Sequence, residues 1–167
     1  MTTGEFEQLI AKQKDKLYRF AFSILKNKED AQDAVQELVL KLWKNKNALD
    51  KTRNLESYCL NTLKNHCFDL LRKEKHKIDY QKSNVQNAST KPELENLDLV
   101  EKLRHELQNL PRQQRLAVEL KDFQGYNYEE ISEILEQSIN TVRTNVSRGR
   151  KKLHEIFKEE LKYADYI

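Results

Sequence analysis

The sequence predicts an all-α protein made of two helical domains joined by a flexible linker. Only 3 Gly and 2 Pro occur among 167 residues, and 8% of residues are aromatic, so few turn-formers and strand-formers are available for a β fold. Apolar residues instead recur at spacings of three and four, the period of an amphipathic helix. A polar stretch without this period, residues 77–98, divides the chain into residues 1–76 and 99–167.

Three apolar stripes predict a small helical bundle in the first domain. They span residues 6–25, 31–43 and 55–71, and each is followed by polar and charged residues. Asn27 lies where the second helix needs an N-cap, because its side chain can accept a hydrogen bond from the backbone three residues on. The core stripe expected for this second helix is Ala31, Ala34, Val35, Leu38, Val39, Leu42 and Trp43.

The linker is rich in Lys, Gln, Asn, Ser and Thr, a composition too polar to form an apolar stripe. Fully extended, residues 77–98 reach about 73 Å. We therefore expect a flexible tether whose length lets the two domains sit apart without touching.

The two cysteines, Cys59 and Cys67, both fall in the third stripe of the first domain. Their Cα atoms would lie about 12 Å apart along a helix, which is too far for a disulfide. The spacing predicts two buried free thiols.

The second domain shows a series of helix boundaries. Pro111 suits the first turn of a helix that ends at Gly125, and Asn127 with Glu130 forms a capping-box pattern for a short acidic helix. Ser138 then starts a last helix. The inward face expected for this last helix is Ile139, Val142, Val146, Leu153, Ile156 and Phe157.

A short acidic helix, a turn and a longer helix with a basic outer face is the pattern of a helix-turn-helix DNA reader. The chain carries no acid from Asn140 to Lys152, and the outer residues there suit base edges and phosphates. Glu136 departs from the pattern, because the turn position it occupies has a left-handed backbone that favours Gly. The candidate DNA contacts are Asn140, Thr141, Arg143, Thr144, Ser147, Arg148, Arg150 and Lys151.

Other function classes find little support. Gly4, Gly125 and Gly149 are scattered, so no glycine-rich phosphate loop can form. His105 and the acid after it resemble the start of a zinc-peptidase motif, but Asn109 stands where the second His is required. We expect no enzymatic activity, no metal and no cofactor. Without a signal-like N-terminus or an apolar run of about 20 residues, a cytoplasmic location is predicted.

Three motifs, taken together, resemble the bacterial sigma-70 family of RNA polymerase sigma factors, and in particular its extracytoplasmic-function (ECF) group. They are residues 30–43, residues 64–73 and the helix-turn-helix at residues 128–150. The resemblance implies that residues 1–76 form a domain like sigma region 2 and that residues 99–167 form one like sigma region 4. It also implies three partners, which are core RNA polymerase, promoter DNA and an anti-sigma factor.

The resemblance further assigns roles to residues of this chain. It assigns docking on core polymerase to Asp33, Gln36 and Glu37. Recognition of the minus-ten element falls to Asn54, Leu55, Glu56, Ser57, Lys64, Asn65, Asp69, Arg72 and Lys73, with Asn65 as the amide that can read an unstacked base. It assigns recognition of the minus-thirty-five duplex to the exposed face of the last helix, the eight candidate DNA contacts between Asn140 and Lys151.

Two alternatives stay open from the residues alone. An ordinary helix-turn-helix regulator would bind operator DNA without polymerase, whereas a sigma factor needs core polymerase for tight promoter binding. A helical interaction protein without a nucleic-acid role would show no steep fall of DNA affinity with salt.

Overall fold

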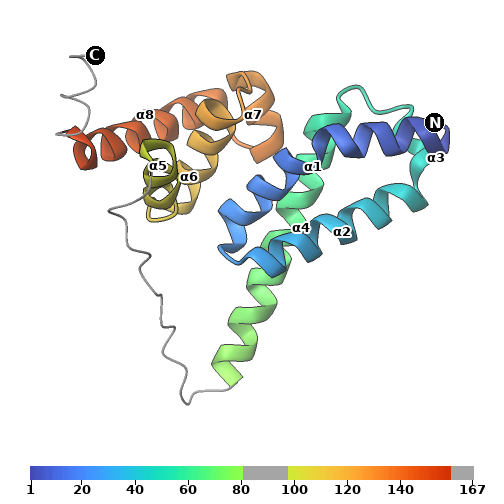
Figure 1. The fold of residues 1–167 in the computed structure, drawn as a ribbon, viewed down its shortest axis with the longest axis horizontal. Helices are drawn as coiled ribbons and strands as arrows, with labels where there is room; N and C mark the ends of the chain where they lie inside the picture. The colour runs from blue at the N-terminus through green and yellow to red at the C-terminus, as the bar shows by residue number, and fades with distance from the viewer. Residues whose placement is uncertain (81–97, 159–167) are drawn as a thin grey trace.

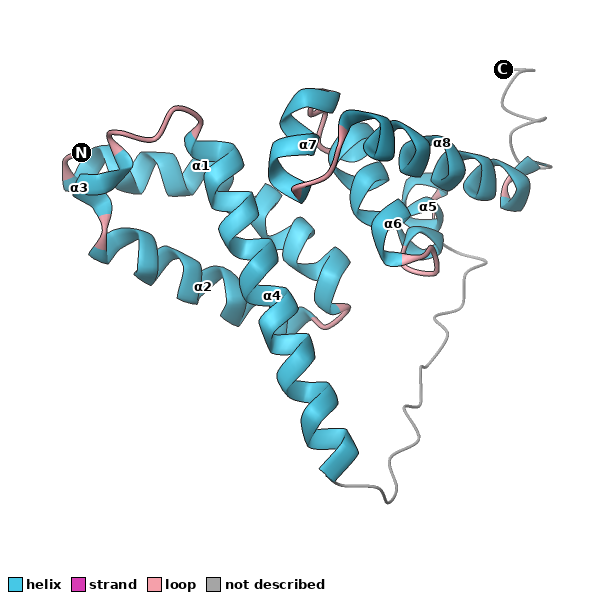
Figure 2. Ribbon diagram, turned by 180° about the vertical axis from the view of Figure 1, so that it is seen from behind, coloured by secondary structure: helices cyan, strands magenta, loops and turns pink. Residues whose placement is uncertain are grey.

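The computed structural model describes residues 1–80 and 98–158, and within these ranges the chain contains helices and loops but no strand (Figure 2). The helices are α1 (Thr3–Leu25), α2 (Lys28–Lys44), α3 (Lys46–Leu49), α4 (Leu55–Tyr80), α5 (Leu99–Leu107), α6 (Arg112–Val118), a π-helical turn (Glu119–Phe123), α7 (Tyr128–Leu135) and α8 (Ile139–Ile156). Figure 1 shows α1 to α4 as one lobe and α5 to α8 as a second lobe beside it. We call these the N-lobe and the C-lobe. The all-α prediction is confirmed.

The predicted N-caps are present. Asn27 and Ser138 each accept a hydrogen bond from the backbone N–H three residues on, at 3.0 and 3.1 Å. Asn127 accepts from the backbone N–H of Glu130 at 2.8 Å, and the Glu130 carboxylate accepts from the N–H of Asn127 at 2.9 Å. These bonds satisfy backbone donors that a helix start leaves unpaired, so these starts follow from local sequence.

Most residues of the expected stripes of α1, α2 and α4 are buried or half-buried, but Tyr58 and Trp43 are exposed. Trp43 was expected in the core but is 38% exposed. It follows the buried Leu42, and its ring packs edge-on against Phe6 while Lys46 lies over it. Trp43 therefore covers the rim of the core near the start of α1.

Both cysteines are buried and free, as predicted. Burial raises the pKa of Cys59 to about 11 and that of Cys67 to about 12. Both side chains are therefore protonated thiols that contribute apolar packing rather than reactivity.

In the C-lobe, α8 crosses closely over α6. The crossing requires a glycine, since a Cβ on Gly149 would lie 2.6 Å from Cγ2 of Val118. Val118 belongs to a buried cluster that also contains Leu153 and Phe157 of the α8 end. Ile156 was expected in this face, but it is 53% exposed because it lies on the flank, beside the face that Leu153 and Phe157 share.

The linker is long enough for the two domains to sit apart, but in this structure they pack against each other. Helix α4 packs on α7, and α1 packs on α6. Apolar residues of α6, the π-helical turn and α7, among them Leu116, Leu120 and Ile134, continue the N-lobe core instead of closing a separate one. Linker length limits how far apart two domains can be, but it does not stop them from packing when each has apolar surface to bury.

The beginning of the expected linker is also helical, because α4 continues to Tyr80. Asp98, its last expected residue, is the N-cap of α5 and accepts from the backbone N–H of Glu101. The rest of the linker, residues 81–97, lies outside the described residues.

Polar contacts tie the lobes together as well. Arg115 of α6 is 4% exposed, and its Nε donates to the backbone oxygen of Ser23 in α1 at 2.5 Å. The same guanidinium donates to the backbone oxygens of Gln108 and Leu110 at 3.2 and 3.0 Å. Burial, together with nearby Arg112, lowers the pKa of Arg115 to about 10. One buried cation thus joins the ends of α1 and α5, where helix dipoles favour positive charge.

Candidate nucleic-acid interface

Helices α7 and α8 form the predicted helix-turn-helix. Glu136 has φ 55°, the left-handed conformation expected at this turn position. The hydroxyl of Ser132 donates to the backbone oxygen of Gln137 at 2.5 Å, which fixes the turn to α7. Ile131 and Val142 are fully buried in the same cluster. The orientation of α8 is therefore set by its own buried face.

All eight candidate DNA contacts on α8 are exposed: Asn140, Thr141, Arg143, Thr144, Ser147, Arg148, Arg150 and Lys151. Arg143 lies over the ring of Tyr128, with 5.3 Å from Cζ to the ring centroid. Arg148, Lys151 and Lys152 form no ion pair within the described residues. This face therefore carries positive charge that the protein itself does not neutralise, as a phosphate-contacting surface requires.

Arg150 differs from its neighbours on α8. Its Nε donates to Oδ2 of Asp122 at 2.8 Å, and this bond raises the pKa of Arg150. The pair fastens α8 to the π-helical turn. Sequence reasoning grouped Arg150 with the free cations because Asp122 is distant along the chain.

The candidate polymerase-docking residues Asp33, Gln36 and Glu37 are exposed on one side of α2. Glu37 Oε2 lies 3.0 Å from Nε2 of His66 on α4. Leu40, which sequence reasoning missed, continues the same helical face and is 59% exposed. The sequence did contain a signal for this exposure, because Leu40 lies outside the apolar stripe that forms the core face of α2. Acid, amide and an apolar side chain thus share one surface beside a cavity of about 350 Å³.

The candidate minus-ten residues fall into two groups. Four of them, Asn65, Asp69, Arg72 and Lys73, are exposed on α4. The Asn65 amide donates to Oδ1 of Asn61 at 3.2 Å, and Asp69 pairs with Arg72. This part of α4 can meet a ligand without rearrangement.

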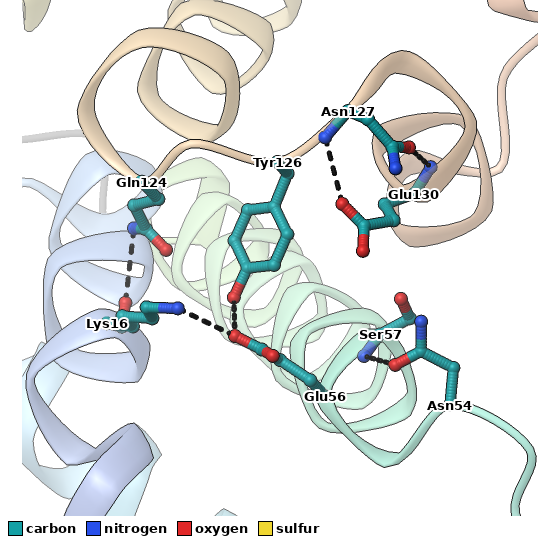
Figure 3. Close-up of polar contacts among 8 residues, drawn as sticks. All are labelled: Lys16, Asn54, Glu56, Ser57, Gln124, Tyr126, Asn127 and Glu130. Carbon is teal, nitrogen blue, oxygen red and sulfur yellow. Dashed lines mark hydrogen bonds and ion pairs between the residues drawn. The ribbon is translucent and has the colours of Figure 1, made fainter.

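The other group consists of Asn54 to Ser57 at the start of α4 and Lys64 further along the helix. Figure 3 shows Glu56 of this group directed toward Tyr126 of the C-lobe. Asn54 accepts from the backbone N–H of Ser57 at 3.1 Å, and so acts as a helix cap. Leu55 is half-buried, while Ser57 and Lys64 are buried. Ser57 and Lys64 are therefore withdrawn from solvent, whereas Asn54 and Leu55 remain partly accessible.

Glu56 is held between the lobes (Figure 3). It accepts a hydrogen bond from the Tyr126 hydroxyl and lies 2.9 Å from Nζ of Lys16. Burial raises its pKa, but the bonds from Tyr126 and Lys16 outweigh burial and leave the pKa below its ordinary value. Gln124 adds a bond to the backbone oxygen of Lys16 at 3.2 Å. Sequence reasoning missed Tyr126, whose partner is far away in sequence.

Within residues 1–80 and 98–158, no group of His, Cys, Asp and Glu side chains is arranged to hold a metal ion. In the same ranges, each helix is too short or too polar to cross a bilayer.

Two family models match the chain, one in each lobe. The model described as Sigma-70 region 2 matches residues 9–77, and the model described as Sigma-70, region 4 matches residues 100–153. Both matches agree with the order of motifs along the sequence.

Individual relatives match nearly the whole chain. It is 30% identical over 155 residues to the RNA polymerase sigma factor SigV of Bacillus subtilis. This match covers 91% of this chain and 91% of SigV. It is 24% identical over 161 residues to the ECF RNA polymerase sigma factor SigW of the same species, covering 89% of this chain and 86% of SigW.

The fold of both lobes has counterparts among solved structures. The sigma factor RpoE of Bartonella quintana, crystallised with the anti-sigma factor NepR, superposes with a TM-score of 0.78 at 24% identity, covering 93% of this chain and 98% of RpoE. CnrH, in complex with the cytosolic domain of CnrY, superposes with a TM-score of 0.66 at 20% identity. The match covers 94% of this chain and 90% of CnrH.

Proposed function

Since the chain belongs to the sigma-70 family of RNA polymerase sigma factors, in its ECF group, we propose that its two lobes divide promoter recognition between them. The protein directs core RNA polymerase to specific promoters and initiates transcription without covalent chemistry of its own. In our proposal the N-lobe docks on polymerase and holds the melted minus-ten strand, and the C-lobe reads the minus-thirty-five duplex. The division follows the expected ranges 1–76 and 99–167, with α4 extending to Tyr80.

The observation that carries this proposal is the exposed face of α8 from Asn140 to Lys152, which holds no acid and follows a capped helix start. The first turns of α8 present Asn140, Arg143 and Thr144, which match donors and acceptors on base edges in the major groove. Arg148 and Lys151 lie further along the helix and contact phosphates. Arg150 contributes chiefly by holding α8 on Asp122.

We expect Arg148→Ala to weaken binding of the holoenzyme to duplex promoter DNA and to reduce the slope of log affinity against log salt by about one unit, because one phosphate contact is lost. The measurement is a salt titration of binding by fluorescence anisotropy. Lys12→Ala, which removes one exposed cation on α1, is the control and should keep the slope. An unchanged slope for Arg148→Ala would remove this residue from the phosphate contacts.

In the N-lobe, Asn65 supports the minus-ten assignment, because its amide is exposed on the same helix as the exposed cations Arg72 and Lys73, two turns further along. We expect Asn65→Ala to reduce open-complex formation by about tenfold, the size of a lost hydrogen bond. Permanganate reactivity of unpaired thymines measures this melting. Asn47→Ala, an exposed amide on α3, should melt the promoter normally, and equal melting by both variants would refute the assignment.

The family resemblance and the structural neighbours support two further parts of the proposal. RpoE was crystallised with the anti-sigma factor NepR, and CnrH was solved in complex with the cytosolic domain of CnrY; we infer that this chain also has an anti-sigma factor. Because its polymerase transcribes the chromosome, we place its action in the cytoplasm.

The experiment that tests the proposed function is transcription with the purified chain and core polymerase of its source. Transcripts should start at defined sites only when both are present. In a mobility-shift assay, tight promoter binding should likewise require core polymerase. Tight binding to duplex DNA by the chain alone would instead indicate an ordinary helix-turn-helix regulator.

A further inference from the structure

A cavity of about 510 Å³ lies between α1 of the N-lobe and α5 of the C-lobe. The start of α2 and the π-helical turn complete its walls. Pockets that bind small molecules have volumes of about 300–1,000 Å³, so this cavity is large enough for one. None of the residues that line it is a candidate contact for DNA or polymerase. The proposed function therefore does not account for this cavity.

The walls of the cavity are largely apolar and aromatic. Tyr18 and Phe22, one turn apart on α1, stack with their ring centroids 6.3 Å apart and their planes at 23°. Both residues are half-buried, so part of each side chain remains accessible. Leu107, which is 1% exposed, contributes to the wall formed by α5. Aromatic and aliphatic side chains in this arrangement favour a flat, apolar ligand.

Three cations also line the cavity, namely Arg19, Lys28 and Arg104. Arg19 and Lys28 are exposed, while Arg104 is half-buried and lies over the ring of Phe123, with 4.8 Å from Cζ to the ring centroid. In the part of the chain that the structure describes, none of the three forms an ion pair. The two guanidinium groups can therefore donate to a planar or tetrahedral anion such as a carboxylate or a sulfonate.

Glu119 is the acid among the lining residues, and it is 3% exposed. Its Oε1 accepts a hydrogen bond from Nε2 of Gln124 at 3.1 Å. Burial raises the pKa of Glu119, although this bond and the charges of Arg104 and Arg19 act in the opposite direction. The residue begins the π-helical turn, a local distortion that is frequent at functional sites. Because three cations face one carboxyl group, the surroundings of the cavity attract anions.

Two further lining residues have hydrogen-bonding groups without a partner. Oε1 of Gln108 and Nδ1 of His105 are buried, and neither has a hydrogen-bond partner within the described residues. Nδ1 of His105 lies 3.5 Å from Oε1 of Glu106, which is too far for a hydrogen bond. Buried polar atoms are normally paired, so both residues keep hydrogen-bonding capacity for a bound molecule.

We propose that this cavity binds an amphipathic organic anion, a molecule with a flat apolar body and one carboxylate or sulfonate group. The apolar body lies against Tyr18, Phe22 and Leu107, and the anionic group pairs with Arg19 and Arg104. An organic cation is disfavoured by the same charges. This inference goes beyond the proposed function, since it uses none of the surfaces assigned to promoter DNA or polymerase.

The test begins with two fluorescent probes that are titrated into the full-length chain. Anilinonaphthalene sulfonate carries the anionic group, whereas N-phenylnaphthylamine has the same rings without it. The sulfonate should bind at a single site, and the uncharged probe should bind about tenfold more weakly, because it lacks charge-assisted hydrogen bonds. Equal affinity for both probes, or no saturable binding of the sulfonate, would overturn the proposal.

A matched pair of charge reversals on α1 tests the assigned cation. Arg19→Glu should weaken binding of the sulfonate probe by about tenfold and leave the affinity for the uncharged probe nearly unchanged. Lys14→Glu makes the same charge change at another exposed position of α1, outside the cavity, and should bind the sulfonate like wild type. Both positions are exposed, so neither change disturbs the core. Equal losses for the two variants would show that overall charge, not this site, attracts the probe.

Glu119→Gln tests the opposite direction. The substitution keeps the shape of the side chain and an oxygen for the bond from Gln124, but it removes the negative charge. The variant should therefore bind the sulfonate probe more tightly than wild type. Weaker or unchanged binding would contradict the assignment of this carboxyl group to the wall of the site.

The position of the bound probe is measured by two-dimensional NMR of the ¹⁵N-labelled chain. The sulfonate should shift the amide signals of residues 18–22, 104–108 and 119, and it should leave those of residues 140–151 unchanged. Shifts centred on another surface would overturn the proposal. Transcription with core polymerase tests the proposed function separately, because the probe measurements use the chain alone.

Discussion

Replacing Glu37 with lysine should abolish assembly with core polymerase, with at least a 100-fold (~3 kcal/mol) loss of affinity. Glu37 lies on the exposed side of α2 with Asp33, Gln36 and Leu40. A lysine there removes the acid and places positive charge where the docking partner has to be basic. It also faces His66, whose Nε2 now lies 3.0 Å from the Glu37 carboxylate. The loss can be measured by titrating labelled core polymerase with the variant.

Two further variants separate docking from general charge. Glu37→Gln keeps the shape of the side chain and should lose an intermediate amount of affinity. Glu7→Lys makes the same charge reversal on the exposed side of α1 and should bind normally. Normal co-purification of Glu37→Lys with polymerase would disprove the docking role. An equal loss for Glu7→Lys would show that overall charge, not this surface, governs binding.

Leu40 gives this docking surface its apolar part, and its omission shows one limit of sequence reasoning. Most of the stripe of α2, from Ala31 to Leu42, could be predicted because residues three and four apart share a helical face, whatever packs against it. Leu40 lies off that stripe, so the pattern alone does not place it in the core. Its exposure became a feature of the surface only once α1 and α4 were seen to cover the other side of α2.

Local hydrogen bonding explains what could be predicted best. The caps at Asn27, Asn127 and Ser138 bond to backbone three residues away, so the necessary information lies within one turn. The left-handed turn at Glu136 follows from the same kind of reasoning, because the two helices of a helix-turn-helix constrain the backbone between them.

Contacts between the lobes could not be predicted in this way. Lys64 has the spacing of an α4 surface residue, and only the C-lobe buries it. Glu56 looks like a free acid in the first turn of α4, yet it is bonded to Tyr126. Each of these pairs joins residues that are distant along the chain. The sequence shows that both lobes exist, whereas their mutual packing depends on shape and on apolar area that no local pattern reports.

Arg115 is a further residue whose contacts between the lobes no local pattern predicts. Replacing it should have the largest effect on stability. Arg115→Met should lower the free energy of unfolding by about 3 kcal/mol, because two buried carbonyl groups and one part-buried carbonyl group lose their donor. They belong to Ser23, Gln108 and Leu110. For a chain of this size the loss corresponds to a fall of about 6–12 °C in the melting temperature. Thermal unfolding followed by circular dichroism measures it.

The geometry of the Arg115 side chain, more than its charge, carries this effect. Arg115→Lys keeps the positive charge but cannot reach α1 and α5 at once, since an ammonium lacks the planar fork of a guanidinium. Lysine should therefore recover only part of the lost stability. Arg112→Met removes the neighbouring exposed arginine and should leave the melting temperature nearly unchanged. If Arg115→Lys melted like wild type, charge at the two helix ends would suffice, and the three directed hydrogen bonds would not be what holds α6 against α1.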